Sequence, residues 1–474
     1  MNARSTPWKP ARLFPLVVVL LILSTSLGDP FAEAAAWVRT GDQHFALGEY
    51  TFARDAQEQA RALLPTRASV LLRLAQSAEA LHRWDEALRH FGAATAYPWA
   101  RGRARAGLAR IAAEVGDTYQ TARLWEQAVS AGRNDPEVLG GYARFLWQRG
   151  EFEQAQSALD RWLQLRPEDA DACYFMGIAR LLGGDASGAR ASLRCAAQGG
   201  ASGATPLLAA LSHEDAPGSP DFCLRMGVAL LSIGENGSAR LLFGQARSLA
   251  PDSPVAGAYY AYTLSLAGDD AGALGILRDV ARLWPSYGLV WYFLGEVEGK
   301  AGRFVEAREH YARLLALDPK NSAACAALGD TYAAEDRFAE AEAWYQKAVE
   351  FSPQDGRFWL AQARFYVERL HGAAIQGVAS ARKAAQLLPD DPAAHDVLGW
   401  ALFLSNDLTG ARGSLERSLQ LDGRSASVQY HAGSLYYALG DRAKALYHLT
   451  RVLDLEPAGR YADLAGDLLR ALGR

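Results

Sequence analysis

The sequence has few cysteines and no strong excess of either charge, and both shortages exclude classes of protein. Four cysteines among 474 residues exclude a small domain held together by disulfides. A formal net charge of −4 gives no basic surface for nucleic acid or anionic lipid. Because 50% of the residues are apolar and 22% are charged, we expect a folded chain with a soluble surface.

Motifs that mark catalytic or cofactor sites are also missing. The sequence contains no Walker-type phosphate loop, no Gly-rich dinucleotide fingerprint, no His-Glu-x-x-His motif, no Cys-x-x-Cys pair and no Gly-x-Ser-x-Gly. The nine histidines are scattered, and we interpret His82 and His90 as surface or groove residues rather than metal ligands. We therefore expect a protein that is not an enzyme, with no catalytic residues, cofactor or metal.

The first 36 residues differ from the rest of the chain. Arg4, Lys9 and Arg12 precede an apolar run over residues 13–27, and small residues follow over 32–36. This order is typical of a secretory signal peptide. As a helix the run rises about 22 Å, short of the roughly 30 Å hydrocarbon core. We expect residues 1–36 to be a cleaved signal peptide, and a retained inner-membrane anchor through residues 13–27 stays open as the alternative.

Alanine is abundant, with 90 copies, and one alanine recurs every 34 residues. The series runs through Ala53, Ala87, Ala155 and Ala189, with Thr121 in one place, then Ala239, Ala273, Ala307, Ala341, Ala411 and Ala445. A glycine stands five places earlier at Gly48, Gly116, Gly150, Gly184, Gly234, Gly268, Gly302 and Gly440. A proline stands twelve places later at Pro65, Pro167, Pro251, Pro285, Pro319, Pro353 and Pro457. Three residue types in one register indicate an internal repeat.

Each period has the pattern of two helices. Within residues 288–321, apolar side chains recur at intervals of three and four over 291–298 and again over 304–315. Gly302 separates the two stretches, and glycine readily takes the left-handed conformation that ends a helix. Pro319 ends the second stretch. Each period therefore predicts a helix–turn–helix hairpin, which buries its faces only by stacking on neighbours.

The chain resembles the tetratricopeptide repeat family. That family places Leu at position 7, Gly or Ala at 8, aromatics at 11, 17 and 24, Ala at 20 and 27, and Pro at 32. Residues 322–355 carry Leu328, Gly329, Tyr332, Phe338, Ala341, Tyr345, Ala348 and Pro353 in those places. The resemblance implies an all-α fold, an α-solenoid built as a right-handed superhelix of about twelve hairpins. The small residues at 8 and 20 are expected where the two helices cross most closely.

The repeats account for the whole chain. Five repeats span residues 34–203 and seven span 220–459, and residues 460–474 form an amphipathic capping helix. Residues 204–219 are an insertion rich in Gly, Ser and Pro. We interpret the insertion as a bulging connection inside one continuous stack, with a hinge, or a surface loop that has a short turn at Leu207, Leu208 and Leu211, as the alternatives.

The cysteines occupy packing positions of the repeats. Cys173, Cys223 and Cys325 stand at position 4, which is buried in this family, and Cys195 stands at position 26 of the same hairpin as Cys173. Both a Cys173–Cys195 bridge and free thiols stay open, subject to a Cα separation under about 7 Å.

The resemblance places the binding surface on the first helices, whose positions 2, 5, 9, 12 and 13 line a concave groove. The candidates at these positions are Arg103, Arg110, Arg144, Trp147, Tyr262, Tyr292, Arg357, Arg364, Trp400, Phe403, Tyr430 and Tyr437. Tyr, Trp and Arg dominate peptide-binding hot spots. The alternative is that some of these side chains are buried against neighbouring helices.

We interpret the protein as a scaffold that binds a protein or peptide partner in this groove. The carboxylate-clamp subtype of the family uses Lys and Asn at positions 5 and 9, which the first repeats lack, so a chaperone co-adaptor is disfavoured. The Ala-, Arg- and Gly-rich composition is typical of bacteria, and export would place the chain in the periplasm. A role in a cell-envelope assembly, secretion, pilus or exopolysaccharide complex is analogy. A membrane-anchored scaffold, polysaccharide binding by the aromatic groove and a glycosyltransferase accessory subunit stay open.

Overall fold

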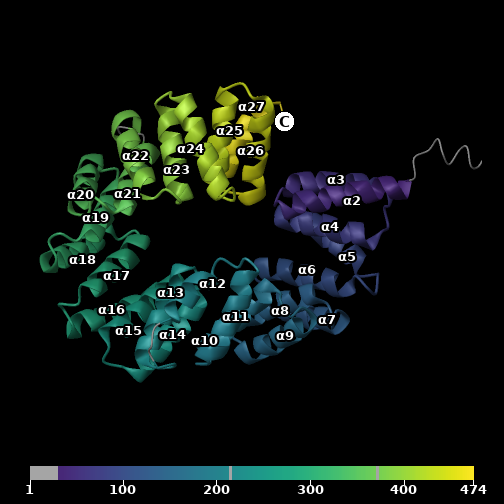
Figure 1. Cartoon of the computed structure of the whole chain (residues 1–474), viewed down its shortest axis with the longest axis horizontal. Helices are drawn as coiled ribbons and strands as arrows, with labels where there is room; N and C mark the ends of the chain where they lie inside the picture. Colours follow the sequence, from purple (N-terminus) through teal and green to yellow (C-terminus); the bar gives the residue numbers. More distant parts are fainter. Residues whose placement is uncertain (1–29, 213–215, 370–372, 474) are drawn as a thin grey trace, which may run out of the picture. The chain divides into compact units, whose positions relative to one another are not determined.

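The computed structural model describes residues 30–212, 216–369 and 373–473, and these residues form helices without strands (Figure 1). The predicted signal segment falls largely outside this part of the chain. Only its small-residue end lies within it, in the first turns of α2, which spans Pro30–Ala46. Among the described residues, no helix combines the length and hydropathy that a membrane span requires.

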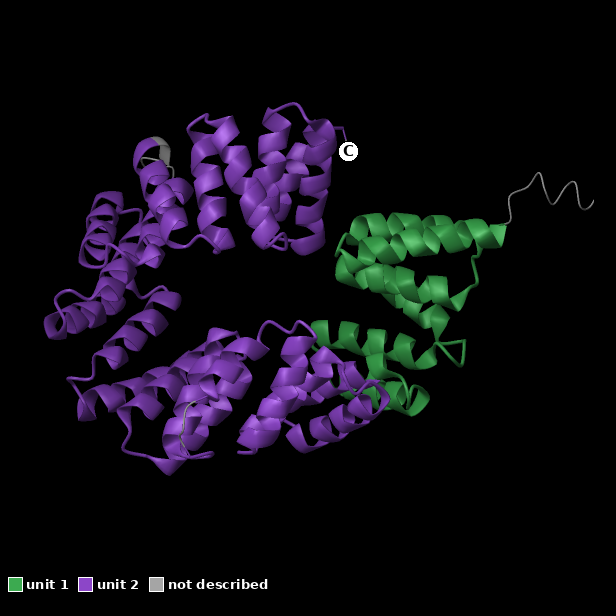
Figure 2. Cartoon of the chain, in the orientation of Figure 1, with its two compact units in different colours: residues 1–138 green, residues 139–474 purple. Residues whose placement is uncertain are grey.

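The chain divides into two compact units, residues 1–138 and 139–474 (Figure 2). This boundary falls between the third and fourth predicted repeats, not at the insertion. In unit 1, α2 is followed by α3 (Tyr50–Leu63), α4 (Ala68–Ala80), α5 (Trp84–Ala94), α6 (Arg101–Glu114) and α7 (Thr118–Ala131). Helix α8 (Pro136–Gln148) begins in unit 1 and lies mostly in unit 2.

Unit 2 continues the alternation of first and second helices. Its first half holds α9 (Phe152–Leu165), α10 (Ala170–Leu182), α11 (Ala186–Gln198), α12 (Ala204–Ala210), α13 (Pro220–Ser232), α14 (Asn236–Leu249), α15 (Pro254–Leu266), α16 (Asp270–Leu283), α17 (Gly288–Lys300) and α18 (Phe304–Leu317). Its second half holds α19 (Ser322–Ala334), α20 (Phe338–Phe351), α21 (Gly356–Glu368), the π-helix η1 (Ala373–Gly377), α22 (Val378–Leu387), α23 (Pro392–Leu404), α24 (Leu408–Leu421), α25 (Ala426–Ala438), α26 (Arg442–Leu455) and α27 (Arg460–Ala471). From α15 to α25, each first helix packs on the second helix of its own hairpin and on the first helix of the next hairpin, or on the capping helix in the case of α25.

The turn inside each hairpin has left-handed backbone conformation. All eight glycines of the predicted series have positive φ, for example 74° at Gly302. Where the series lacks glycine, His82, Asp336 and Asn406 take its place with φ of 54°, 57° and 66°. The register therefore fixes the backbone conformation even where the residue type changes.

The two helices of a hairpin cross where the first helix has glycine. A Cβ at Gly295 would lie 2.4 Å from the ring of Tyr311, and one at Gly399 would lie 2.5 Å from Leu415. In both pairs the large residue follows sixteen positions later, at position 24 of the repeat. The glycine thus leaves the space that the large side chain of the second helix fills.

The insertion at 204–219 is partly a buried helix. Helix α12 packs against α11 and α13, and Ala204, Leu207 and Leu211 are buried in one core with residues from α10 to α14. Gln245 of α14 also donates to the Leu182 carbonyl of α10 at 3.2 Å. The core therefore runs through the insertion, so the surface-loop alternative is wrong for residues 204–211.

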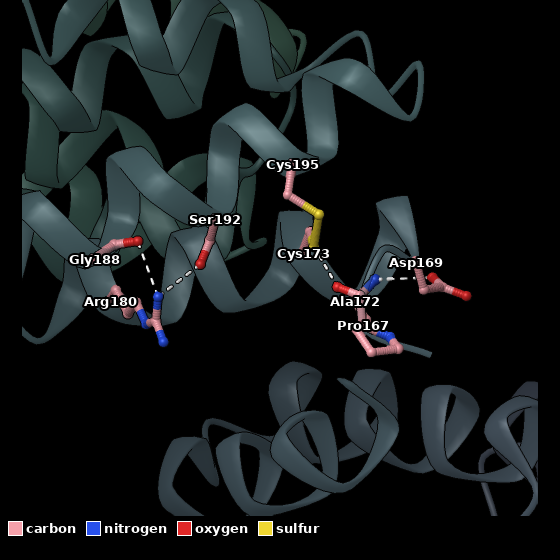
Figure 3. The surroundings of a disulfide bond; sticks show 8 residues. All are labelled: Pro167, Asp169, Ala172, Cys173, Arg180, Gly188, Ser192 and Cys195. Carbon is pink, nitrogen blue, oxygen red and sulfur yellow. Dashed lines mark hydrogen bonds between the residues drawn. A yellow bond between two sulfur atoms is a disulfide. The ribbon is translucent and has the colours of Figure 1, made fainter. Parts of the chain in front are cut away.

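The structure joins Cys173 and Cys195 in a disulfide between α10 and α11 (Figure 3). Their Cα atoms are 5.9 Å apart, inside the limit set from the sequence. On the same pair of helices, Arg180 donates to the Gly188 carbonyl and the Ser192 hydroxyl (Figure 3). Cys223 and Cys325 are free and buried. One hairpin thus carries a covalent link in addition to its packing.

Substituting Gly295 by alanine tests the crossing. The added methyl group must displace the Tyr311 ring, so we expect Gly295→Ala to lower the free energy of unfolding by about 1–3 kcal/mol. Gly275 is the matched control, because it is exposed in α16 with open space around its Cα and alanine is the better helix former by up to about 1 kcal/mol. Urea denaturation measures both variants. A neutral Gly295→Ala would contradict the crossing as described.

Candidate functional site

The two candidate arginines of unit 1 are held by carboxylates of neighbouring hairpins. Arg110 on α6 donates two hydrogen bonds to Glu79 on α4, at 2.6 and 2.7 Å. Arg103, also on α6, pairs with Asp135 at 2.6 Å and with Glu137 at 3.1 Å. Such bidentate pairs fix guanidinium groups geometrically. In unit 1 these arginines therefore link successive first helices.

At the start of unit 2, the candidates Arg144 and Trp147 on α8 contact other helices. Arg144 donates to Asp171 on α10 at 2.8 Å. The Trp147 ring packs edge-on against Phe152, and its Nε1 donates to Ser238 on α14 at 3.3 Å. Trp147 also packs against the core that includes α12. Its indole thus packs between helices, as the alternative stated from the sequence describes.

Tyr262 and Tyr292 lie in the middle of unit 2. Tyr262 on α15 stacks on Phe293 with 4.5 Å between ring centroids. Burial raises the pKa of Tyr292 well above its ordinary value, and the nearby Glu296 raises it further. Burial also raises the pKa of Tyr262, so both hydroxyls are protonated at neutral pH.

The other candidates lie on α21, α23 and α25, where a cavity of about 560 Å³ opens between first helices. The candidates that line this cavity are Arg364, Trp400 and Tyr430. Phe403 and Tyr437 lie outside its lining. Arg357 is exposed and forms an ion pair with Asp355 at 2.6 Å. The capping helix α27 completes the wall with Arg460, Tyr461 and Leu464. The cavity is the candidate functional site.

A buried polar pair forms the floor of this cavity. His431 Nδ1 donates to Asp396 Oδ1 at 2.7 Å, and Ser427 donates to the other carboxylate oxygen at 3.1 Å. The Trp400 indole stacks on His431 with 4.2 Å between ring centroids and on Phe403 with 4.8 Å. This network joins α23 to α25 and fixes the orientation of Trp400.

Tyr461 connects the capping helix to the acidic groups of the cavity. Burial raises the pKa of its hydroxyl, and the carboxylates of Asp396 and Glu368 raise it as well, while Arg460 lowers it. Tyr461 therefore presents a neutral O–H donor beside carboxylates. The cavity combines aromatic rings, carboxylates and the two arginines Arg364 and Arg460.

Sequence reasoning missed Asp396, His431 and Tyr461. Asp396 stands at position 5 of its repeat, a groove position in the pattern that was used, yet aspartate was not counted among the aromatic and arginine candidates. His431 stands at position 6, outside that pattern, and its neighbour is 35 residues away. A capping helix is expected to cover the end of the stack, so the sequence pattern of residues 460–474 gives no reason to expect a site residue at Tyr461.

Carboxylates do surround His90, contrary to the reading of the histidines as scattered groups. Glu58 on α3 and Glu86 and His90 on α5 each offer one ligand atom, and these atoms lie within 4.8 Å of one another. Arg61 pairs with Glu58 at 2.7 Å and Arg83 pairs with Glu86 at 3.0 Å. Burial lowers the pKa of His90, so its ring is neutral at pH 7. The group could ligate a divalent cation only by competing with both arginines.

Known families agree with the repeat pattern. Three tetratricopeptide repeat models match the chain, one over residues 112–172 and 300–365, one over 143–204 and 261–322, and one over 427–458. The chain belongs to the tetratricopeptide repeat family. The matched ranges fall in both compact units, which agrees with the alternating first and second helices.

Two curated relatives share part of this repeat protein. It is 25% identical over 182 residues to cellulose synthase operon protein C of Xanthomonas axonopodis pv. citri (strain 306), covering 37% of the chain and 12% of the relative. It is 22% identical over 286 residues to the CTR9 homolog of Arabidopsis thaliana, covering 58% of the chain and 25% of the relative. The chain therefore spans a quarter or less of these relatives.

Solved structures show likeness in fold. Yeast Tom70 is 15% identical with a TM-score of 0.43, covering 94% of this chain and 96% of that chain. YrrB, described as a tetratricopeptide repeat protein with an unusual peptide-binding site, is 19% identical with a TM-score of 0.33, covering 41% and 97%. PilW, a type IV pilus biogenesis factor, is 16% identical with a TM-score of 0.40, covering 46% and 98%.

Tetratricopeptide repeats form protein-binding scaffolds, and the repeat protein has this general character. The family is typically non-catalytic, and the family models that match indicate no enzyme. The groove of such a scaffold acts by shape, hydrogen bonds and charge.

A double-mutant cycle tests the buried pair in the cavity. Asp396→Leu leaves His431 and Ser427 without their acceptor, so we expect it to lower the free energy of unfolding by about 2 kcal/mol. His431→Phe in addition removes the donor, and the double variant should lose less than the two single variants together, with a coupling of at least about 1 kcal/mol. Urea denaturation measures the cycle. Strict additivity would contradict the pairing.

Proposed function

We propose that the cavity formed by α21, α23, α25 and α27 binds a segment of a protein or peptide partner. The observation that carries the proposal is the convergence of Arg364, Trp400, Tyr430 and Tyr461 from four first helices on one cavity of about 560 Å³. Aromatic and arginine side chains around a partly desolvated cavity are typical of interface hot spots. The buried Asp396–His431 pair keeps the walls in place before a ligand arrives.

The polysaccharide alternative has less support from the cavity. Sugar binding by aromatic residues requires a free ring face. The Trp400 indole already stacks nearly parallel to two rings, at interplanar angles of 16° to His431 and 10° to Phe403. Ring contacts inside the protein thus already use part of the indole face that a sugar would need, and this supports a peptide over a sugar.

For cellular location, we propose export to a bacterial periplasm and a role in a cell-envelope assembly or secretion complex, with an inner-membrane anchor as the alternative. The basic, apolar and small-residue order of residues 1–36 supports export. The Cys173–Cys195 disulfide supports an oxidising compartment. Similarity to a cellulose synthase operon protein supports an envelope role.

Site-specific photocrosslinking tests the partner site. A benzoylphenylalanine at position 430 should crosslink to a segment of a protein, which mass spectrometry of the joined peptide identifies. The same group at position 119 is the control, since Tyr119 is exposed on α7 in unit 1. Trp400→Ala should reduce the crosslink at position 430 by about tenfold or more. Equal crosslinks at both positions would contradict the site, and glycan-array binding that is lost in Trp400→Ala would favour the polysaccharide alternative.

N-terminal sequencing of the protein isolated from its cells tests export. We expect the mature chain to begin near residues 35–37, after one of the small-residue motifs. An intact Met1 would contradict cleavage and favour the anchor.

A further inference from the structure

A row of carboxylates and tyrosines runs along the first helices of unit 2 and ends in the cavity. Tyr311 on α18 donates to Glu296 on α17 at 2.8 Å. One hairpin later, Tyr345 on α20 donates to Asp330 on α19 at 2.5 Å. In each pair the tyrosine stands at position 24 and the carboxylate at position 9 of the same repeat. Glu368 at the end of α21 follows and lines the cavity. We call Glu296, Asp330 and Glu368 the acidic row.

The three carboxylates are close enough to influence one another. The Asp330 side chain is partly desolvated, and the negative charges of Glu296 and Glu368 act on it. These effects raise the pKa of Asp330, while the Tyr345 hydroxyl lowers it. Glu368 also raises the pKa of Tyr461 in the cavity. The acidic row thus places one carboxylate on each of the successive first helices α17, α19 and α21, and the last of them lines the proposed partner site.

Among the residues that the structure describes, the acidic row has none of the ion pairs that neutralise other carboxylates of unit 2. Glu298 on α17, for comparison, pairs with both Arg278 and Arg303. Within the described residues of unit 2, the ion pairs closer than 4 Å include none of the three carboxylates of the row. Arg369 pairs with Asp336 at 3.6 Å, and the arginines that line the cavity together with Glu368 are Arg364 and Arg460.

Tyrosine hydroxyls hold Glu296 and Asp330 in place without cancelling their charge. A tyrosine O–H donates a hydrogen bond yet stays neutral, so the carboxylates keep their negative charge and a fixed position. Like charges held side by side in a partly desolvated groove repel one another, and a cationic ligand relieves that repulsion. Position 9 is the place where the carboxylate-clamp subtype has asparagine. Here it is acidic in two successive repeats, and in the next repeat it is Arg364, with Glu368 one helical turn later at position 13.

We infer that the partner segment is basic, with lysine or arginine side chains that contact Glu296, Asp330 and Glu368. This inference rests on the proposed function of the cavity and assigns the charge of its ligand. Neighbouring packed helices lie about 8–10 Å apart, and an extended chain advances about 3.3 Å per residue. A basic residue at about every third position of the peptide would therefore meet one carboxylate per hairpin.

Fluorescence anisotropy with the full chain tests the charge of the partner segment. The probes are three fluorescein-labelled peptides of equal length that carry arginine, citrulline or glutamate at every third residue of a Gly/Ser background. We expect the arginine peptide to bind at least about tenfold more tightly than the citrulline peptide, and the glutamate peptide to bind most weakly. Binding of the arginine peptide should weaken as salt rises from about 50 to about 500 mM.

Charge-neutral variants locate the contact. Glu296→Gln, Asp330→Asn and Glu368→Gln together should weaken the arginine peptide by about tenfold or more, while the citrulline peptide changes little. Glu350→Gln is the control, because it removes one exposed carboxylate at the end of α20, outside the acidic row. Circular dichroism confirms that each variant is folded.

Two results would overturn the inference, and they separate it from the proposed function. The first is citrulline or glutamate peptides that bind as tightly as the arginine peptide. The second is an arginine peptide whose affinity is unchanged in the triple variant. If any of these peptides still loses binding in Trp400→Ala, the proposed function stands and only the charge assignment is wrong. If Trp400→Ala affects none of them, both proposals are wrong for extended peptides of this kind.

Discussion

The close crossing of two helices within each hairpin is the constraint on which the rest of the structure depends. A glycine on the first helix leaves space for a large residue sixteen positions later, such as Tyr311 above Gly295. This contact brings the two helices together, and a left-handed turn residue joins them. Because position 8 is Gly or Ala in every copy, the hairpins close in a similar way and present similar first-helix faces to their neighbours.

The polar contacts of the first helices depend on that arrangement. Residues on successive first helices meet at separations close to one period, as for Arg110 with Glu79 and Arg103 with Asp135 in unit 1. In unit 2 the tyrosine that fills the crossing also reaches the groove, where Tyr311 and Tyr345 hold carboxylates. The same side chain therefore serves packing and the electrostatics of the groove.

The sequence predicts the hairpins well because their determinants are local and periodic. Glycine at 302 and alanine at 307 recur in register, and a repeated local pattern needs no knowledge of distant contacts. A disulfide between Cys173 and Cys195 could be considered from the sequence for the same reason, since both residues lie in one hairpin.

The features that the sequence does not predict depend on contacts between residues outside the 34-residue register. The burial of Leu207 in α12 depends on side chains from helices on both sides of the insertion, and glycine-rich flanks conceal it. Asp396 and His431 are 35 residues apart in the sequence, and they meet only because α23 packs against α25. The division between residues 138 and 139 has no composition signal, although the neighbouring repeat has Thr121 where the others have alanine.

The disulfide between Cys173 and Cys195 has a consequence for cooperativity. The disulfide joins two residues that are 22 positions apart within one hairpin. In a repeat array, each hairpin is stabilised mainly by its immediate neighbours. Fraying that starts at either end of unit 2 would therefore meet a locally reinforced segment at α10 and α11, next to the core that α12 extends. Reduction of this bond would change where opening stops along the array, while hairpins several repeats away would keep their own stability.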